Sequence, residues 1–201
     1  MSDRLFIVGL GGTTRPGSTS ERALVIALEA AAELGCDTQL IGAAAMPGEP
    51  FDPARPERSA QARAMVAALR RADGLLLATP AYHGGVSGLV KNAIDFTEDM
   101  KDDPRPYLDG RAVGCFVVAD GVQAIGATLG ALRAIVHSLR GWPTPFAATL
   151  SGRDRPFGAH GVPADPSALQ SCRLVAEQVV TFARGQRLLA AQRPARPGTA
   201  D

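Results

Sequence analysis

Short apolar runs alternate with amphipathic stretches along most of the chain. Apolar runs predict strands at residues 5–10, 74–79 and 112–119, and two further short strands are expected at 37–41 and 144–150. Apolar residues recur at helical spacing in the segments that follow the runs, namely 21–34, 59–71, 86–100, 127–139 and 165–184. Parallel neighbours in a sheet need a crossover connection, so this alternation predicts a parallel sheet with helices on both faces.

The positions of the prolines predict where loops lie and where a strand ends. Four prolines between residues 45 and 58 predict a loop there, because each one removes a backbone donor. Pro80 is expected to end the third strand for the same reason. In the fifth strand, Phe146 and Ala148 are the expected core residues.

Composition limits the class of protein and its partners. The chain has 201 residues, of which 46% are hydrophobic and 20% charged, with a formal net charge of +1. We expect one domain over residues 1–185 and a flexible C-terminal tail over 186–201, which is rich in Ala, Arg and Pro. The near-neutral balance argues against nucleic acid or an anionic membrane as a partner. No apolar run reaches the roughly 20 residues of a membrane span, and no signal peptide is recognised, so a cytoplasmic protein is expected.

The cysteines and histidines predict no metal site. Cys36, Cys115 and Cys172 are far apart and odd in number, and no C-x-x-C spacing occurs. The three histidines form no ligand set with them. Neither a disulfide framework nor a zinc site is therefore expected.

The loop that follows the first strand carries the strongest chemical signal. Gly11–Ser20 joins a strand to a helix, where N–H groups and the helix dipole favour an anion. Position 14 is Thr, which breaks the dinucleotide pattern G-x-G-x-x-G, and the lysine of a P-loop is absent. A terminal monophosphate such as that of FMN fits a cradle of this kind, although a simple capped helix with Ser20 as N-cap remains an alternative. The candidate phosphate ligands are Thr13, Arg15, Ser18, Thr19 and Ser20.

A second candidate loop follows the third strand. Its glycines allow the backbone to approach a flat ring, and Tyr82 could stack near that ring. His83 could donate a proton to a ligand bound beside this loop. The candidate residues of this loop are Pro80, Ala81, Tyr82, His83, Gly84 and Gly85.

These two loops resemble the NADPH-dependent FMN reductase family, which includes azoreductase-like and quinone-reductase-like members. The family reads approximately P-x-Y-x-G-x-x-x-x-x-L-K-N-x-I-D in the second loop and the helix after it, and this chain departs from it only at Val90, where Leu is usual. The first loop resembles the family's G-S-x-R-x-x-S-x-N/S, with Thr13 in place of the first serine. The resemblance covers about residues 5–150.

The resemblance implies a flavodoxin-like three-layer sandwich with a five-stranded parallel sheet in the order 2-1-3-4-5. It also implies a third contact from the loop after the fourth strand, which is less glycine-rich here than in the family, with candidates Asp120, Gly121 and Gln123. Lys91, Asn92 and Asp95 are expected to have structural or interface roles. No side chain is expected to act as a covalent catalyst.

The function implied is an NAD(P)H-dependent flavin oxidoreductase. Hydride would pass from NADPH or NADH to FMN and then to a small acceptor such as free flavin, a quinone or an azo compound. A flavin-dependent monooxygenase is a further candidate partner, and a homodimer or homotetramer is expected by resemblance. Two alternatives remain, namely an electron-transfer flavodoxin without NAD(P)H activity and a non-catalytic binding module on the same fold.

Overall fold

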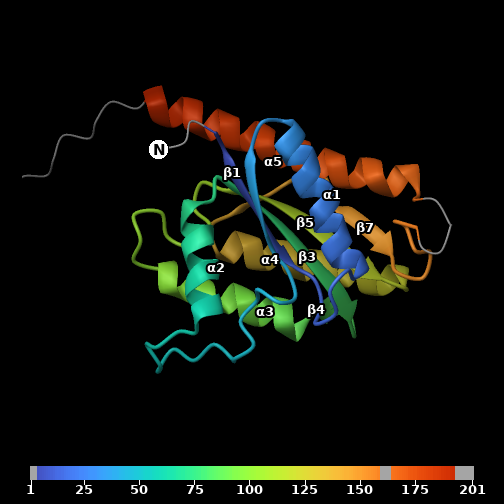
Figure 1. The fold of residues 1–201 in the computed structure, drawn as a ribbon, viewed down its shortest axis with the longest axis horizontal. Helices are drawn as coiled ribbons and strands as arrows, with labels where there is room; N and C mark the ends of the chain where they lie inside the picture. The colour runs from blue at the N-terminus through green and yellow to red at the C-terminus, as the bar shows by residue number, and fades with distance from the viewer. Residues whose placement is uncertain (1–3, 159–163, 193–201) are drawn as a thin grey trace, which may run out of the picture.

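The computed structural model describes residues 4–158 and 164–192. The strands are β1 (Phe6–Gly11), β2 (Asp37–Ile41), β3 (Gly74–Tyr82), β4 (Gly85–Val86), β5 (Ala112–Ala119), β6 (Trp142–Pro143) and β7 (Ala148–Ser151). The helices are α1 (Thr19–Glu33), α2 (Ala60–Arg71), α3 (Gly88–Asp95), the 3-10 helix η1 (Phe96–Met100), α4 (Val122–Ser138) and α5 (Pro166–Gln192). Figure 1 shows the central strands between the helices.

The main sheet is parallel and has the order β2-β1-β3-β5-β6, with β7 also paired to β5. This arrangement confirms the flavodoxin-like order 2-1-3-4-5. The fifth position is shared by two short strands, which pair with β5 through Ala112↔Trp142 and Phe116↔Ala148. The remaining strand, β4, forms an antiparallel hairpin with β3.

The fifth strand differs from its expected form because its middle leaves the ladder. The Phe146 N–H donates to the Gln178 side chain at 3.1 Å, and Pro143 and Pro145 have no N–H to donate. Phe146 was expected in the core, but 36% of it is exposed, so that prediction is wrong. Ala148 is fully buried, as expected.

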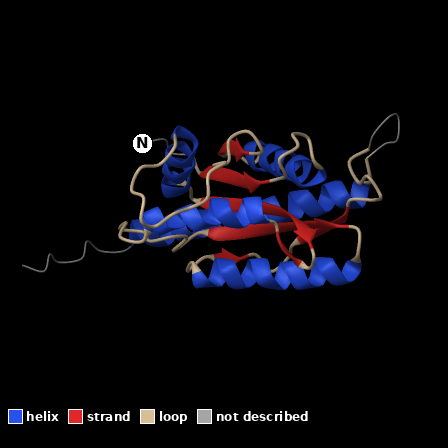
Figure 2. Ribbon diagram, turned by 90° about the horizontal axis from the view of Figure 1, so that it is seen from below, coloured by secondary structure: helices blue, strands red, loops and turns tan. Residues whose placement is uncertain are grey.

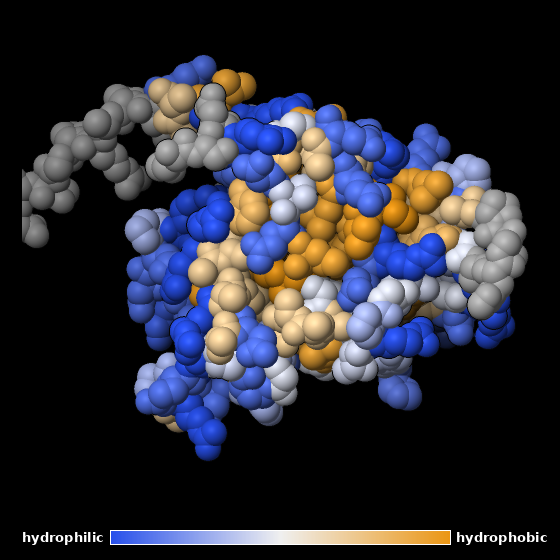
Figure 3. Space-filling view, in the orientation of Figure 1, coloured by the Kyte–Doolittle hydropathy of each residue, from blue (hydrophilic) through white to orange (hydrophobic). Residues whose placement is uncertain are grey.

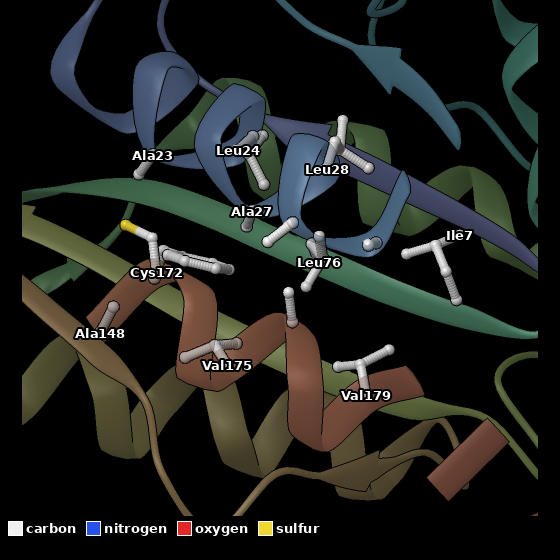
Figure 4. Close-up of a cluster of buried hydrophobic side chains, with 14 of the residues drawn as sticks. Ile7, Ala23, Leu24, Ala27, Leu28, Leu76, Ala148, Cys172, Val175 and Val179 are labelled. Atoms are coloured by element: carbon white, nitrogen blue, oxygen red, sulfur yellow. The ribbon is translucent and has the colours of Figure 1, made fainter. Parts of the chain in front are cut away.

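Side chains alternate between two cores, one on each face of the sheet. Leu76 of β3 points into the core beneath α1 and α5, and its neighbours Leu75 and Leu77 point into the core beneath α2, α3 and α4. Figure 2 shows helices on both sides of the strands. Figure 4 shows the first core, where Leu24 and Leu28 of α1 and Val175 and Val179 of α5 pack over the same face of the strands.

Two helical segments end differently from their expected ends. The segment expected as one helix over 86–100 is α3 followed by η1. The last helix was expected to end at residue 184, but α5 continues to Gln192, so residues 186–192 of the expected flexible tail are helical. Arg187 supports this extension through a 2.9 Å ion pair with Asp73. The rest of the expected tail, 193–201, lies outside the described residues.

Polar groups at the amino end of the sheet are satisfied by partners within the chain. Arg111, directly before β5, is 1% exposed and donates to the carbonyls of Ala72, Tyr107 and Arg70 at 2.9–3.0 Å. Two of these carbonyls belong to the C-terminal end of α2, which lacks intrahelical donors. Burial lowers the pKa of Arg111 to about 10, so the guanidinium is charged at neutral pH. Asp73, directly before β3, accepts the Phe6 N–H at 2.8 Å.

One face of the molecule carries apolar side chains surrounded by polar ones. On the face seen in Figure 3, apolar side chains gather near the middle, around α1 and the sheet edge, and polar side chains surround them. Within the described ranges, no helix has the length and apolar character that crossing a membrane requires.

Candidate functional site

A cavity of about 500 Å³ opens at the carboxyl end of the sheet, where β1, β3, β5 and β7 end. In an open parallel sheet this end is where ligands bind. Ten of the residues singled out from the sequence line it, together with four others. The complete lining is Thr13, Arg15, Ser18, Thr19, Ser20, Pro80, Ala81, Tyr82, Val118, Ala119, Asp120, Gly121, Ala124 and Gly152.

The backbone after β1 turns sharply enough that only glycine fits. Gly11 has φ 138°, and a Cβ at this position would lie 1.9 Å from the Ala78 carbonyl oxygen. The next residue, Gly12, also has positive φ and donates its N–H to the same oxygen at 3.2 Å. This contact fixes the start of the first loop against β3.

The first loop presents unused N–H groups at the start of α1. Ser18 is the N-cap, because its hydroxyl accepts the Glu21 N–H, so the expectation of Ser20 as cap is wrong. Ser18 and Ser20 are buried, and their hydroxyl oxygens lie 3.3 Å apart. Within the described chain, the N–H groups of Ser18, Thr19 and Ser20 donate no hydrogen bond. An anion held there would meet three donors and the positive end of the helix dipole.

Arg15 adds the positive charge of this loop. Its side chain is exposed and lines the cavity, and in the described part of the chain no carboxylate pairs with it. Its backbone is held by a local turn, in which the Thr13 hydroxyl accepts the Arg15 N–H at 3.0 Å. The guanidinium is therefore placed at the cavity with its hydrogen-bonding capacity unused.

The second loop is a β-hairpin rather than an open loop. Tyr82 pairs with Gly85, and the two turn residues His83 and Gly84 have φ of 53° and 78°, as a type I′ turn requires. Pro80 was expected to end the strand, but β3 continues through it to Tyr82. Proline is compatible with the extended backbone, and the hairpin partner continues the pairing beyond it. The exposed turn places His83, Gly84 and Gly85 outside the cavity lining, whereas Tyr82 lines it with 58% of its surface exposed.

Thr79 holds the two ends of this hairpin together. Its side chain is fully buried, donates to the Pro80 carbonyl at 2.8 Å and accepts the Ser87 N–H at 3.0 Å. Ser87 in turn caps α3 by accepting the Val90 N–H. The hairpin is therefore attached to both the sheet and the following helix.

The third loop is shorter than expected. A turn was expected over residues 120–126, but α4 begins at Val122, which places Gln123 in its first turn, exposed and outside the cavity lining. Asp120 and Gly121 do line the cavity. Four lining residues were not foreseen: Val118, Ala119, Ala124 and Gly152. They also lie at strand ends or the start of α4, so their position after a strand was the available signal.

The helix after the hairpin has a structural role in this chain. Asn92 donates to the Glu49 carbonyl at 2.9 Å and accepts the Phe51 N–H at 2.8 Å, so it holds the proline-rich loop. Lys91 and Asp95 form an exposed ion pair at 2.6 Å within α3. None of the three lines the cavity.

The chemistry available in the cavity is that of binding. Its charged lining residues are Arg15 and Asp120. Burial raises the pKa of the Cys115 and Cys172 thiols to about 12, which keeps them protonated. In residues 4–158 and 164–192, no cluster of three or more His, Cys, Asp or Glu side chains could hold a metal ion.

Comparison with known proteins identifies the family. Residues 6–154 match the family model of the NADPH-dependent FMN reductases, and the chain therefore belongs to that family. It is 32% identical over 113 residues to an FMN-dependent NADPH-azoreductase of Staphylococcus aureus strain USA300. That match covers 55% of this chain and 56% of the relative, so the chain spans about half the length of the curated relatives it matches.

Solved structures share the fold at low sequence identity. RosB, solved with bound 8-demethyl-8-formylriboflavin-5'-phosphate, superposes with a TM-score of 0.69 at 16% identity, over 98% of this chain and 90% of that one. A WrbA-like flavodoxin from Agrobacterium tumefaciens superposes with a TM-score of 0.59 at 20% identity, over 92% and 99%. These similarities establish a flavodoxin-like fold.

Proposed function

We propose that this chain is an NAD(P)H-dependent flavin oxidoreductase that binds FMN in the cavity at the carboxyl end of the sheet. The observation that carries the proposal is the first loop. Arg15, Ser18, Thr19 and Ser20 line one cavity, and the N–H groups of the last three have no acceptor in the described chain. The family match supports FMN as the ligand. The azoreductase relative supports a small electron acceptor.

The residues present fit the two ends of FMN. The buried hydroxyls of Ser18 and Ser20 and the N–H groups at the start of α1 suit a phosphate, and Arg15 adds a charge-assisted bond. The segment Pro80–Tyr82 offers backbone and an aromatic ring to the flat isoalloxazine. A cavity of about 500 Å³ lies within the usual size of a cofactor site.

The flavin, when bound, supplies the hydride chemistry, accepting hydride from NADPH or NADH and passing it to the acceptor. The protein binds and orients it. The first loop holds the phosphate, and the hairpin fixed by Thr79 positions the ring. No nucleophile is needed, and the exposed side chain of Tyr82 flanks the open side, where a second substrate would stack. A single stacking place predicts ping-pong kinetics.

His83, Gly84, Gly85 and Gln123 are the weaker members of the proposed cofactor site, because they do not line the cavity. Any contact between these residues and a bound flavin would come from the hairpin turn or the start of α4. The proposal extends to a cytoplasmic homodimer or homotetramer, and to delivery of electrons to free flavin, a quinone or an azo compound, or of reduced flavin to a monooxygenase.

The deciding experiment is anaerobic stopped-flow of the FMN-loaded protein mixed with NADPH or NADH. Rapid loss of flavin absorbance, followed by reoxidation on adding an azo dye, quinone or free FMN, is the expected result. Flavin that binds but is not reduced by either nucleotide would favour an electron-transfer flavodoxin. A protein that remains colourless after incubation with FMN would favour a binding module for another ligand.

A further inference from the structure

Glu21 is a charged residue that directly follows the first loop. It lies outside the family's phosphate-loop motif and is not among the residues that line the cavity. It is the third residue after the N-cap Ser18, so Ser18–Glu21 has the S-x-x-E pattern of a capping box. In that motif the glutamate normally accepts the N–H of the N-cap residue itself. Here it does not, and the difference concerns the groups that would bind a phosphate.

The Glu21 carboxylate makes two other hydrogen bonds. Oε1 accepts the N–H of Gly17, one residue before the cap, at 3.0 Å. Oε2 accepts the N–H of Ala43, in the loop after β2, also at 3.0 Å. The carboxylate thus joins the first loop to a neighbouring loop and leaves the Ser18 N–H without an acceptor in the described chain.

We propose that Glu21 is a positioning residue for the flavin phosphate, which holds the first loop open by bridging Gly17 and Ala43. The inference rests on the proposed FMN site. Glu21 does not bind the ligand. It draws the Gly17 N–H away from the ligand side and leaves the N–H groups of Ser18, Thr19 and Ser20 for the phosphate.

Charge repulsion alone predicts the opposite change in phosphate affinity when Glu21 is removed, so the two roles can be told apart. A carboxylate close to a bound phosphate repels it, so removing that charge would tighten phosphate binding. If Glu21 instead positions the loop, its removal weakens phosphate binding, because the donors lose their shared orientation. The sign of the change therefore separates the two roles.

The structure offers a second way to move this carboxylate without changing it. A Cβ on Gly42 would lie 2.6 Å from Glu21 Oε2, the mobile end of a flexible side chain. The G42A variant should therefore push the carboxylate away from the Ala43 N–H. A Cβ on Gly48, in the same connection between β2 and α2, meets nothing within 4 Å, so G48A is the matched control.

The test compares dissociation constants for FMN and riboflavin, which differ by the phosphate, in flavin-fluorescence titrations of wild type, E21A, E21Q and G42A. We expect E21A to weaken FMN binding about tenfold relative to riboflavin, and E21Q and G42A about threefold, because each retains part of the bridge. The controls are G48A and E29A, whose glutamate is exposed on α1; both should stay within about twofold of wild type. A general loss of folding would weaken both flavins together.

Amide hydrogen exchange in the flavin-free protein gives an independent readout, and we expect faster exchange at Gly17 and Ala43 in E21A. The role of Glu21 would be overturned if E21A bound FMN as tightly as wild type, or more tightly, relative to riboflavin. Unchanged amide exchange at Gly17 and Ala43 would overturn it as well. Either result would leave the proposed function intact. If E21A does not fold, the ratios of E21Q and G42A decide in the same way. A wild-type protein that binds neither flavin overturns the proposed function, whatever the exchange data show.

Discussion

At the amino end of the sheet, the Arg111 guanidinium donates to the carbonyls of Ala72, Tyr107, Arg70 and Asp109. The Asp73 carboxylate there accepts the Phe6 N–H and forms an ion pair with Arg187. At the carboxyl end, the N–H groups at the start of α1 have no acceptor in the described chain, and Arg15 has no carboxylate partner there. Both ends carry charged and polar groups directly before or after strands. They differ in whether the chain itself completes their hydrogen bonds.

This difference separates residues that stabilise the fold from residues that are available to bind a ligand. Groups with partners inside the chain stabilise the fold, and removing one leaves its partners unsatisfied. Groups without such partners contribute little to folding but are available to a ligand. Variants at the amino end should therefore change the free energy of unfolding, and variants at the carboxyl end should change flavin binding. The four predictions below test that separation.

The largest effect is expected for Arg111→Met. It removes the donors of the Ala72, Tyr107 and Arg70 carbonyls, in hydrogen bonds that are buried or partly buried, so we expect a loss of about 3 kcal/mol in the free energy of unfolding, measured by urea denaturation without flavin. The affinity ratio of FMN to riboflavin should not change. Arg63→Met, at an exposed site on α2, is the control. A loss under about 1 kcal/mol would contradict the structural role of Arg111.

Next comes Arg15→Met at the opposite end. Loss of one charge-assisted bond should weaken FMN binding about tenfold, which is about 1.4 kcal/mol, with riboflavin unaffected. Arg15→Lys should recover part of the affinity, since it keeps the charge but loses the planar fork. Fluorescence titration measures both. The separation of the two ends fails if the free energy of unfolding falls by more than about 0.5 kcal/mol.

Asp73→Asn should have a smaller effect on folding. The amide oxygen can still accept the Phe6 N–H, but the ion pair with the partly exposed Arg187 is lost, so we expect about 1 kcal/mol in the same urea experiment. Asp102→Asn, at an exposed site, should leave stability unchanged. Flavin titrations that differed between these two variants would show that the ends are coupled.

The smallest effect is expected for Asp120→Asn. The Asp120 carboxylate lines the cavity and opposes negative charge gained by a bound flavin on reduction. Its removal should raise the two-electron potential of bound FMN by about 10 mV, equivalent to about twofold tighter binding of the reduced form relative to the oxidised form. Spectroelectrochemistry measures the shift, which should shrink at high salt because the side chain is exposed. A fall in potential would show that the carboxylate acts through a hydrogen bond instead.

Much of the fold was predictable because local pattern and global architecture agree. The apolar runs of β1 and β5 reflect burial within the sheet, and the periodicity of α1 and α2 reflects packing against it. The structure follows both patterns closely. The errors fall where a tertiary partner decides. Phe146 has a strand-like sequence around it, but the Gln178 side chain takes its N–H out of the ladder.

The candidate site shows the same limit. Ser18 and Pro80 line the cavity, and the family resemblance had named both as site residues. The type I′ turn of the hairpin was not foreseen, because such turns usually contain Asn-Gly, Asp-Gly or Gly-Gly, whereas His83 and Gly84 occupy it here. Glu21 was missed because its partner Ala43 is distant in sequence, and only the fold brings them together.

The hairpin between β3 and α3 has a consequence for how this protein can diversify. Its two ends are joined at the base by the Thr79 hydroxyl and again by the pairing of Tyr82 with Gly85. His83 and Gly84 lie beyond both links, at the tip. Their replacement by a longer loop would leave the base, and with it the first loop, in place. Insertion at this tip is thus a route by which evolution or design can remodel the entrance of the proposed flavin site without changing the first loop.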